Sequence, residues 1–540
     1  MKNKSKRVLV LLVAVIMLLG LVACQQGGTQ PSKEETQKPT PTPTAKSAAT
    51  EPAKTDPPDP MAEWKLYDKP TTWVAMRTTF ANAPSSGDQL AHKEMEKITN
   101  VYLDIQEAGR GAEYNKALNL AFATDSQPEI IAVSASAAQK YAADTGKIID
   151  LTELLKEHGK NYLARVKQHN LEKRATASDG KYWNISKIRI EHDNRVGMIN
   201  KPLLDELNLK VPTTVEEMTE VLRKVKAHNP EAIPWIAGAY SGSGGVYAFA
   251  EYCFNISKGP QEFNNAIRYS YYEDQDATKD MVKWLRTLYK EGLLDASYLS
   301  RSNDDANAAI RQGQVAFVFG WFSGGTDKVD ADGKTIPDST EWVTVPGMMA
   351  PDGKRHLSPN NPVHIGIAVT SKAADPEKVV KYFDYYFTDA GTELFNYGVK
   401  GVTFNEVDGK KVYTDLIAKA TSPMNAARAQ GVLVEEWPMY QPEAMPGLYG
   451  NKLGESIKES IKYWDPLPPV LSASPDKMQE MSAIRADLDK TWQAYFADMI
   501  TGDKEVDDLW PEYVSRVKEA KVERYIELIR EMYQNWLNKK

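Results

Sequence analysis

Residues 312–320 of this 540-residue chain read Gln-Gly-Gln-Val-Ala-Phe-Val-Phe-Gly. An unbroken apolar run from Val315 to Phe319 follows a polar turn and ends at Gly320. A strand with one wet face alternates apolar and polar residues, whereas a continuous apolar run is typical of a strand covered on both faces. The stretch therefore predicts a buried strand in a sheet with helices on both sides.

The chain on the N-terminal side of this stretch alternates between short apolar runs and helical stretches. Strands are predicted at residues 73–76, 101–105 and 129–133, and helices at 87–99 and 113–123. Strand–helix alternation at this spacing is typical of parallel βαβ units. The sequence thus indicates the α/β class.

Other elements extend the pattern towards both ends. Thr214, followed three residues later by Glu217, predicts a capped helix start, and the helix should end near His228, before Pro230. Breaks in the helical tail are expected at Gly502 and Pro511. The remaining predicted strands cover residues 196–200 and 364–370, and the remaining helices cover 280–291, 376–388 and most of 478–536.

The first residues have the order of parts of a signal peptide. Lys2, Lys4, Lys6 and Arg7 precede an apolar run that is too short for a spanning helix, and Leu21-Val22-Ala23-Cys24 follows. The alternative is an uncleaved N-terminal anchor in which Cys24 is incidental. Leu-Val-Ala-Cys resembles the lipobox of bacterial lipoproteins, which implies cleavage after residues 1–23, lipidation of Cys24 and anchoring by acyl chains.

Residues 24–61 are expected to form a disordered tether behind the lipidated cysteine. The segment is rich in Gln, Thr, Pro, Lys and Glu, and Pro-Thr-Pro-Thr-Pro-Thr stands at residues 39–44. It has almost nothing apolar to bury, so it should stay extended and carry the folded body away from the membrane. A glycosylated stalk is an equally good interpretation of the Thr/Pro composition.

Size, charge and cysteine usage limit the possibilities for the rest of the chain. The length beyond the tether is too great for a single core, so at least two lobes are expected. Removal of the four basic residues in the signal peptide would change the net charge from −7 to about −11. An acidic body with no Lys/Arg block argues against nucleic acid as a partner. Without Cys24, Cys253 is the single cysteine, so no intramolecular disulfide can form.

No catalytic or metal motif is recognisable in the sequence. The chain lacks Gly-x-Ser-x-Gly, a P-loop, His-Glu-x-x-His and Cys-x-x-Cys, and no two of its seven histidines are three or four residues apart. We therefore expect a protein that is not an enzyme and holds no metal or cofactor. A secreted glycoside hydrolase stays open as an alternative, because two carboxylates suffice for that chemistry.

Several segments together resemble the family 1 extracellular solute-binding proteins of ABC importers, in particular the long lipoproteins of Gram-positive bacteria. Their order and spacing extend over nearly the whole mature chain. The segments are Ile199-Asn200-Lys201-Pro202-Leu203-Leu204, Tyr289-Lys290-Glu291-Gly292-Leu293-Leu294, Gly313-Gln314-Val315-Ala316-Phe317, Phe387 to Leu394 with Tyr397 to Val402, and Met499-Ile500-Thr501-Gly502-Asp503.

The resemblance implies a fold of the periplasmic-binding-protein type, class II: two α/β lobes joined by a hinge, with a helical C-terminal tail. On these segments the N-terminal lobe should comprise residues 62–196 and 362–405, and the C-terminal lobe 197–361 and 406–540. The lobes are expected to close on a ligand by hinge motion.

Residues at the carboxyl ends of strands are the candidates for ligand contact, because open α/β sheets bind ligands there. Trp321 and Phe322 directly follow the buried strand, and their rings suit the apolar faces of a sugar. Family members that bind sugars commonly have a stacking tryptophan where Trp321 lies. The further candidates, each of which could equally be a packing residue, are Arg77, Asn82, Ser134, Trp183, Trp235, Tyr240, Trp437, Tyr440 and Trp464.

Arg77 also bears on the charge of the ligand. A guanidinium binds a carboxylate through two parallel hydrogen bonds, so Arg77 in the site would favour an acidic sugar. A surface arginine without ligand contact is the alternative.

The sequence thus predicts a lipid-anchored protein on the extracellular face of the cell membrane. It is expected to act as a monomer that captures a carbohydrate, of oligosaccharide size, and delivers it to the permease subunits of an ABC importer. A lipoprotein that senses its ligand for a membrane receptor is the alternative with the same architecture.

Overall fold

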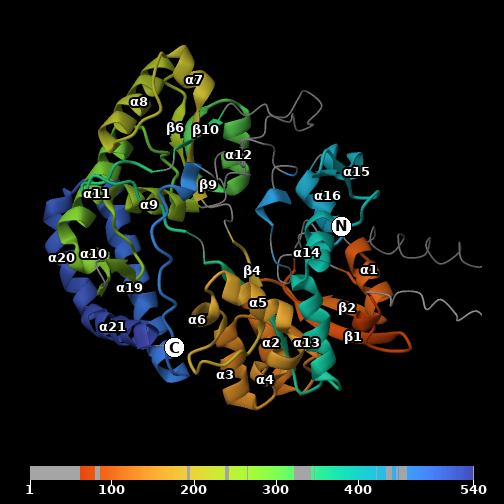
Figure 1. The fold of residues 1–540 in the computed structure, drawn as a ribbon. Helices are drawn as coiled ribbons and strands as arrows, with labels where there is room; N and C mark the ends of the chain where they lie inside the picture. The colour runs from red at the N-terminus through yellow and green to blue at the C-terminus, as the bar shows by residue number, and fades with distance from the viewer. Residues whose placement is uncertain are drawn as a thin grey trace, which may run out of the picture. The chain divides into compact units, whose positions relative to one another are not determined.

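The computed structural model describes most of the chain from residue 61 onwards (Figure 1). The described residues are 61–79, 86–190, 195–237, 242–263, 266–321, 342–345, 347–359, 361–420, 422–432, 439, 441–444, 448 and 459–538. In this part of the chain, no helix has both the length and the apolar character needed to span a bilayer.

The first sheet has five strands in the order β2-β1-β3-β11-β4. Its strands are β1 (Thr71–Arg77), β2 (Val101–Glu107), β3 (Ile130–Val133), β4 (Ile185–Ile188) and β11 (Val363–Val369). Strand β1 is parallel to β2 and β3, as the βαβ pattern predicts, whereas β11 is antiparallel to both β3 and β4. The sheet is therefore mixed rather than wholly parallel.

The second sheet has four strands in the order β10-β5-β9-β6. They are β5 (Arg195–Asn200), β6 (Ile233–Ile236), β9 (Val315–Trp321) and β10 (Trp342–Val345). The quoted stretch forms β9, parallel to β6 and antiparallel to β5. Phe317 of β9 belongs to one apolar core and Val318 to another, so both faces of the strand are covered, as predicted.

Close approach of the strands explains Gly197, the residue of β5 between β9 and β10. A Cβ on Gly197 would lie 2.8 Å from both the Phe317 ring and the Val345 carbonyl oxygen. Only glycine leaves room for that ring beside the backbone.

Helices and short hairpins surround the two sheets. The predicted N-cap is confirmed, because the Thr214 side chain accepts a hydrogen bond from the Glu217 amide. Glu217 Oε2 accepts in turn from the amide and hydroxyl of Thr213, at 2.7 and 2.8 Å.

The remaining elements N-terminal to β9 are η1 (Ala62–Trp64), α1 (Leu90–Thr99), α2 (Ala112–Ala123), α3 (Ala135–Thr145), α4 (Thr152–His158), α5 (Lys160–Gln168), α6 (Glu172–Ala175), α7 (Lys201–Glu206), α8 (Val215–His228), α9 (Gly242–Phe254), β7 (Gln261–Phe263), β8 (Ala266–Arg268), α10 (Ser270–Glu273), α11 (Gln275–Lys290) and α12 (Asn303–Arg311). Those C-terminal to β11 are α13 (Pro376–Asp384), η2 (Tyr385–Phe387), α14 (Asp389–Tyr397), β12 (Phe404–Val407), β13 (Lys410–Tyr413), α15 (Asp415–Ala418), α16 (Pro423–Ala429), η3 (Pro442–Ala444), α19 (Pro475–Thr501), α20 (Val506–Glu519) and α21 (Val522–Asn538).

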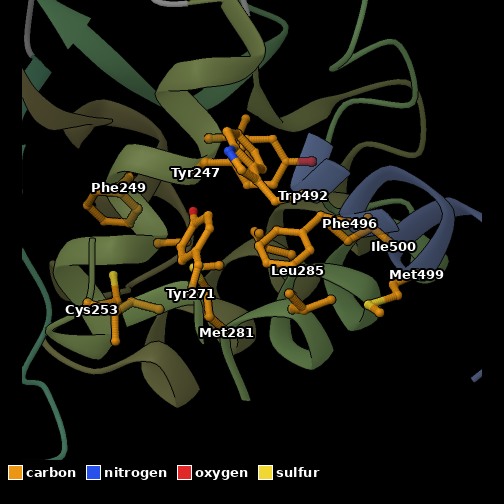
Figure 2. Packing of buried hydrophobic residues seen from close by; sticks show 14 of the residues in the cluster. Tyr247, Phe249, Cys253, Tyr271, Met281, Leu285, Trp492, Phe496, Met499 and Ile500 are labelled. Atoms are coloured by element: carbon orange, nitrogen blue, oxygen red, sulfur yellow. The ribbon is translucent and has the colours of Figure 1, made fainter. Parts of the chain in front are cut away.

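The C-terminal helices α19, α20 and α21 lie beside α10 and α11 (Figure 1). Their buried aromatic residues, among them Trp492 and Phe496, join the core of the second sheet, where they pack with Tyr247 and Tyr271 (Figure 2). Cys253 lies within this core as a free thiol.

The predicted break at Pro511 is wrong, although the one at Gly502 is confirmed. Helix α20 continues through Pro511, and the chain turns instead near Lys521, which has φ +65°. Pro511 costs the helix one hydrogen bond. Burial of the neighbouring Trp510 and Tyr513 offsets that loss.

The order of the described strands shows that the chain passes between the two sheets twice. Sheet membership changes between Ile188 of β4 and Arg195 of β5, and again between Val345 of β10 and Val363 of β11. The amide of Arg189 donates to the carbonyl of Pro362 at 2.8 Å, so the two passages are hydrogen-bonded to each other. The assignment of every other segment to one lobe or the other stays a prediction.

Candidate functional site

The strand directions bring the carboxyl edges of both sheets to the passages between them. In the second sheet, Trp321 at the end of β9 pairs with Arg195 at the start of β5, and Val345 at the end of β10 pairs with Gly197. In the first sheet, Ile188 at the end of β4 pairs with Val363 at the start of β11. Both passages thus connect the two edges at which open sheets bind ligands.

Trp321 is the last residue of β9 and lies at this edge by its backbone pairing. Its side chain is not among those described. Six further predicted positions lie outside the described residues altogether: Cys24, Asn82, Tyr240, Phe322, Trp437 and Tyr440.

Two of the predicted residues, Ser134 and Trp183, are brought together at the carboxyl end of β3. Ser134 is the N-cap of α3 and accepts from the Ala137 amide at 3.2 Å. The partly buried Trp183 packs against the cluster that contains Val133. The side chain of Asn184 donates to the Val133 carbonyl at 2.8 Å, which fixes the neighbouring Trp183 beside the strand end.

Sequence reasoning missed the residue that orients Trp183. Its indole Nε1 donates to Asp179 Oδ2 at 2.9 Å, across the turn at Gly180. The signal that could have found it is the Asp-Gly-Lys-Tyr-Trp sequence, because a turn at Gly180 brings Asp179 back towards Trp183.

Arg77 ends β1 but lies inside the fold, where it is 1% exposed. Strand alternation places it on the same face as Trp73 and Ala75. It lies close enough to the buried His92 to affect its protonation: burial and, secondly, the Arg77 charge lower the pKa of His92 to about 3. The burial of Arg77 excludes the alternative of a surface arginine, and it also leaves the guanidinium without the exposure that contact with an acidic ligand would need.

Trp235 is a core residue rather than a ligand contact. It lies in the middle of β6 with no exposed surface, and the rings of Phe249 and Phe317 meet it edge-on at 5.4 and 5.2 Å. The prediction placed Trp235 after a strand, where it could contact a ligand, whereas the structure places it within β6, where it packs in the core.

Trp464 lies beside the second passage between the sheets, where it forms a parallel bridge with Leu357. Next to this bridge, His356 lies between two carboxylates that sequence reasoning had not singled out. His356 Nδ1 is 2.9 Å from Asp465 Oδ1, and Nε2 is 3.0 Å from Asp352 Oδ2. Hydrogen bonding to Asp465 raises the pKa of His356, and Asp352 adds to the effect.

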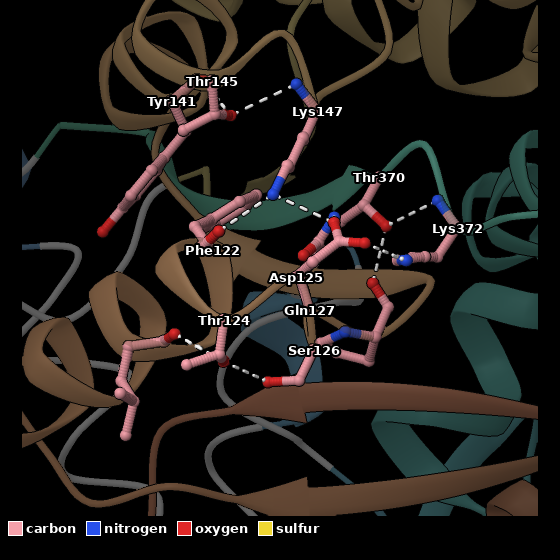
Figure 3. A network of polar contacts seen from close by, with 12 residues as sticks. Phe122, Thr124, Asp125, Ser126, Gln127, Tyr141, Thr145, Lys147, Thr370 and Lys372 are labelled. Carbon is pink, nitrogen blue, oxygen red and sulfur yellow. Dashed lines mark hydrogen bonds and ion pairs between the residues drawn. The ribbon is translucent and has the colours of Figure 1, made fainter.

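The opposite end of β3 carries a different kind of polar cluster (Figure 3). Asp125, with φ +57°, binds Lys147 at 2.9 Å and Lys372 at 2.8 Å. These two lysines hold the pKa of the Asp125 carboxyl well below its usual range. Thr370 Oγ1 donates to the Pro128 carbonyl at 2.6 Å, and together these contacts join the β3 approach to the end of β11.

Within the described ranges, no group of three or more His, Cys, Asp and Glu side chains is arranged to hold a metal ion.

Comparison with known proteins gives a consistent set of relatives. The family described as bacterial extracellular solute-binding protein matches residues 79–393, more than half of the chain. The polygalacturonan/rhamnogalacturonan-binding protein YtcQ of Bacillus subtilis is 22% identical over 59% of this chain. The substrate-binding protein FusA of a fructooligosaccharide ABC transporter in Streptococcus pneumoniae is 22% identical over 62% of it. The matched regions span 64% of the length of each of these two relatives.

Among solved structures, an alginate-binding protein crystallised without calcium ion superposes with a TM-score of 0.71 at 21% identity. The superposition covers 87% of this chain and 99% of that protein. At this identity the likeness shows the fold, a two-domain α/β architecture of the kind that solute-binding proteins have.

Proposed function

Because this chain belongs to the bacterial extracellular solute-binding proteins, which are binding proteins rather than enzymes, we propose that it captures an oligosaccharide for an ABC importer. The observation that carries the proposal is the meeting of both carboxyl edges at the passages between the sheets. A ligand that touches both edges would favour the closed arrangement of the lobes, and the permease subunits would receive the ligand from it.

The carbohydrate assignment draws on the two relatives named above, one a polygalacturonan/rhamnogalacturonan-binding protein and the other the substrate-binding protein of a fructooligosaccharide transporter. Aromatic rings at strand ends, Trp321 and Trp183, suit the apolar faces of sugar rings. Ser134, Trp464, Phe322, Asn82, Tyr240, Trp437 and Tyr440 remain proposed contacts at lower priority. The buried Trp235 and Arg77 are not included.

A thermal-shift screen against neutral oligosaccharides, uronates, peptides and polyamines tests the proposal. A ligand at 100 times its dissociation constant stabilises a protein by about 2.7 kcal/mol, which gives a readily measured shift. Shifts with peptides alone would refute the carbohydrate ligand, and turnover of any sugar would refute the binding-only role.

The membrane anchor is a separate part of the proposal. Cys24 is expected to carry the acyl chains and residues 24–61 to act as the tether, with the body a monomer outside the cell. Expression of a Cys24→Ser variant tests the anchor: the wild type should fractionate with membranes and the variant should not. Equal membrane association of the two would refute lipid anchoring.

A further inference from the structure

The loop from residue 176 to 184 places a tryptophan ring and a carboxylate side by side at the carboxyl end of β3. Its tight turn is closed by the Ala177 amide, which donates to the Lys181 carbonyl at 2.9 Å. Gly180 occupies the left-handed region, with φ +78°, which a side chain would disfavour. The loop is therefore a defined turn rather than an irregular connection.

Asp179 uses both of its carboxylate oxygens to organise this loop. Oδ1 accepts from the Lys181 amide at 3.0 Å, and Oδ2 accepts from Trp183 Nε1 at 2.9 Å. Both bonds lie near the solvent, and Asp179 itself is exposed. One residue thus fixes both the backbone turn and the orientation of the indole.

The neighbours of Trp183 are held as well. The Tyr182 carbonyl accepts from the Leu151 amide at 2.9 Å, and the Tyr182 amide donates to Thr152 Oγ1 at 3.2 Å. On the other side, Asn184 is bonded to the Val133 carbonyl. A ring held from both sides loses little freedom when a ligand stacks on it, which favours binding.

The hydrogen bond to Asp179 also determines what the ring can offer. Its single N–H donor is already engaged, so the indole contributes apolar surface rather than a hydrogen bond. The Asp179 carboxylate has further acceptor capacity, and sugar hydroxyls are donors of the matching kind.

The local charges favour a neutral partner. Lys181 Nζ lies over one face of the Trp183 ring, 5.5 Å from its centre, and forms an ion pair with Asp150 at 2.7 Å, so a sugar would stack there only with the flexible lysine moved aside. Asp150 neutralises the Lys181 ammonium group, so the Asp179 carboxylate leaves a negative charge next to the indole. A uronate carboxylate beside Asp179 would be repelled.

We propose that Trp183 and Asp179 form a subsite for a neutral sugar unit, with Trp183 as the stacking surface and Asp179 as the residue that positions it and selects against uronates. The inference rests on the proposed carbohydrate-binding function and adds a specificity to it.

The test uses calorimetric titration of the full mature chain with neutral fructo- and galacto-oligosaccharides and with an oligogalacturonate of the same length. The wild type should bind a neutral oligosaccharide more tightly than the oligogalacturonate. Trp183→Ala and Asp179→Ala should each weaken neutral binding by about tenfold. Asp179→Asn removes the charge and replaces one of the two accepting oxygens by an NH2 group, so it should weaken neutral binding by less than Asp179→Ala does and narrow the preference over the uronate about fivefold.

Asp150→Asn is the matched control, because it removes a neighbouring carboxylate and the Lys181 ion pair without touching the bond to the indole. The Asp150→Asn variant should bind the neutral oligosaccharide as tightly as the wild type, in contrast to Asp179→Ala. Circular dichroism and the melting temperature should show that all variants fold.

A wild type that prefers the oligogalacturonate, or an Asp179→Asn variant with an unchanged ratio of the two affinities, would overturn the subsite while the carbohydrate-binding function stands. Absence of binding to every carbohydrate tested would overturn both.

Discussion

Trp235 and Trp183 arose from the same prediction, yet they occupy opposite kinds of environment. Trp235 lies within β6, enclosed by Phe249 and Phe317, and has no exposed surface. Trp183 lies beside the end of β3, with its indole bonded to an exposed aspartate. The difference follows from position along the strand, because side chains within a doubly covered strand must pack, whereas those beyond its end can face a ligand.

Truncation of the enclosed ring should have the largest effect. Trp235→Ala leaves a cavity between two aromatic neighbours and should lower the free energy of unfolding by about 3–5 kcal/mol. Urea denaturation measures the change, and Trp235→Phe, which keeps most of the volume, is the control. A loss below 1 kcal/mol would show that the ring is not part of a tightly packed core.

Trp321, the last residue of β9, is the best position at which to distinguish a packing tryptophan from a ligand-binding one. If it belongs with Trp183, Trp321→Ala should weaken oligosaccharide binding by about tenfold or more and leave the melting temperature nearly unchanged. Titration of the variant with the best ligand from the screen measures this. Unchanged affinity would remove Trp321 from the site, and a large loss of stability would place it with Trp235.

The passage between the sheets should respond to pH through His356. Its folded pKa is raised, so its contribution to stability is fully present below the unfolded value of about 6.5 and is lost as pH rises through the folded pKa. Between pH 6 and about pH 8.5, the wild type should lose about 1 kcal/mol of unfolding free energy relative to His356→Gln.

Urea denaturation of both proteins at each pH measures the difference. The comparison between variants is needed because His92, buried with a pKa lowered to about 3, contributes in the opposite direction: its stabilisation is lost as pH falls below about 6.5. A difference between wild type and variant that does not change with pH would refute the proposed role of His356.

The smallest effect is expected at the amino end of β3. Asp125→Asn removes the charge that pairs with Lys147 and Lys372, but exposed ion pairs contribute little to stability. The melting temperature at neutral pH should fall only slightly, and sugar affinity should not change, because the cluster lies at the edge away from the proposed subsite. A clear change in affinity would contradict that separation of the two ends of β3.

Local sequence signals predicted much of the fold. The apolar run of β9, the spacing of β1 to β3 and the Thr214 cap each depend on residues close in sequence, and the structure has all of them. The antiparallel β11 and the continuation of α20 through Pro511 were missed, because both depend on packing with distant segments.

The candidate site was less predictable for the same reason. The aromatic residues near strand ends could be found, but Trp235 and Trp183 could not be told apart without the packing around them. His356 was missed because its partners, Asp352 and Asp465, come together only through the pairing of residue 357 with 464. Asp179 could have been predicted from the sequence, because the turn at Gly180 brings it next to Trp183.

The Arg189 amide, just beyond the end of β4, donates to the carbonyl of Pro362, just before β11. The two passages therefore leave the first sheet as neighbours, next to the pair formed by Ile188 and Val363. Sliding of one passage past the other at this point would break the bond, whereas rotation of both together would preserve it. We therefore expect relative motion of the two sheets to be bending at a paired hinge rather than shear.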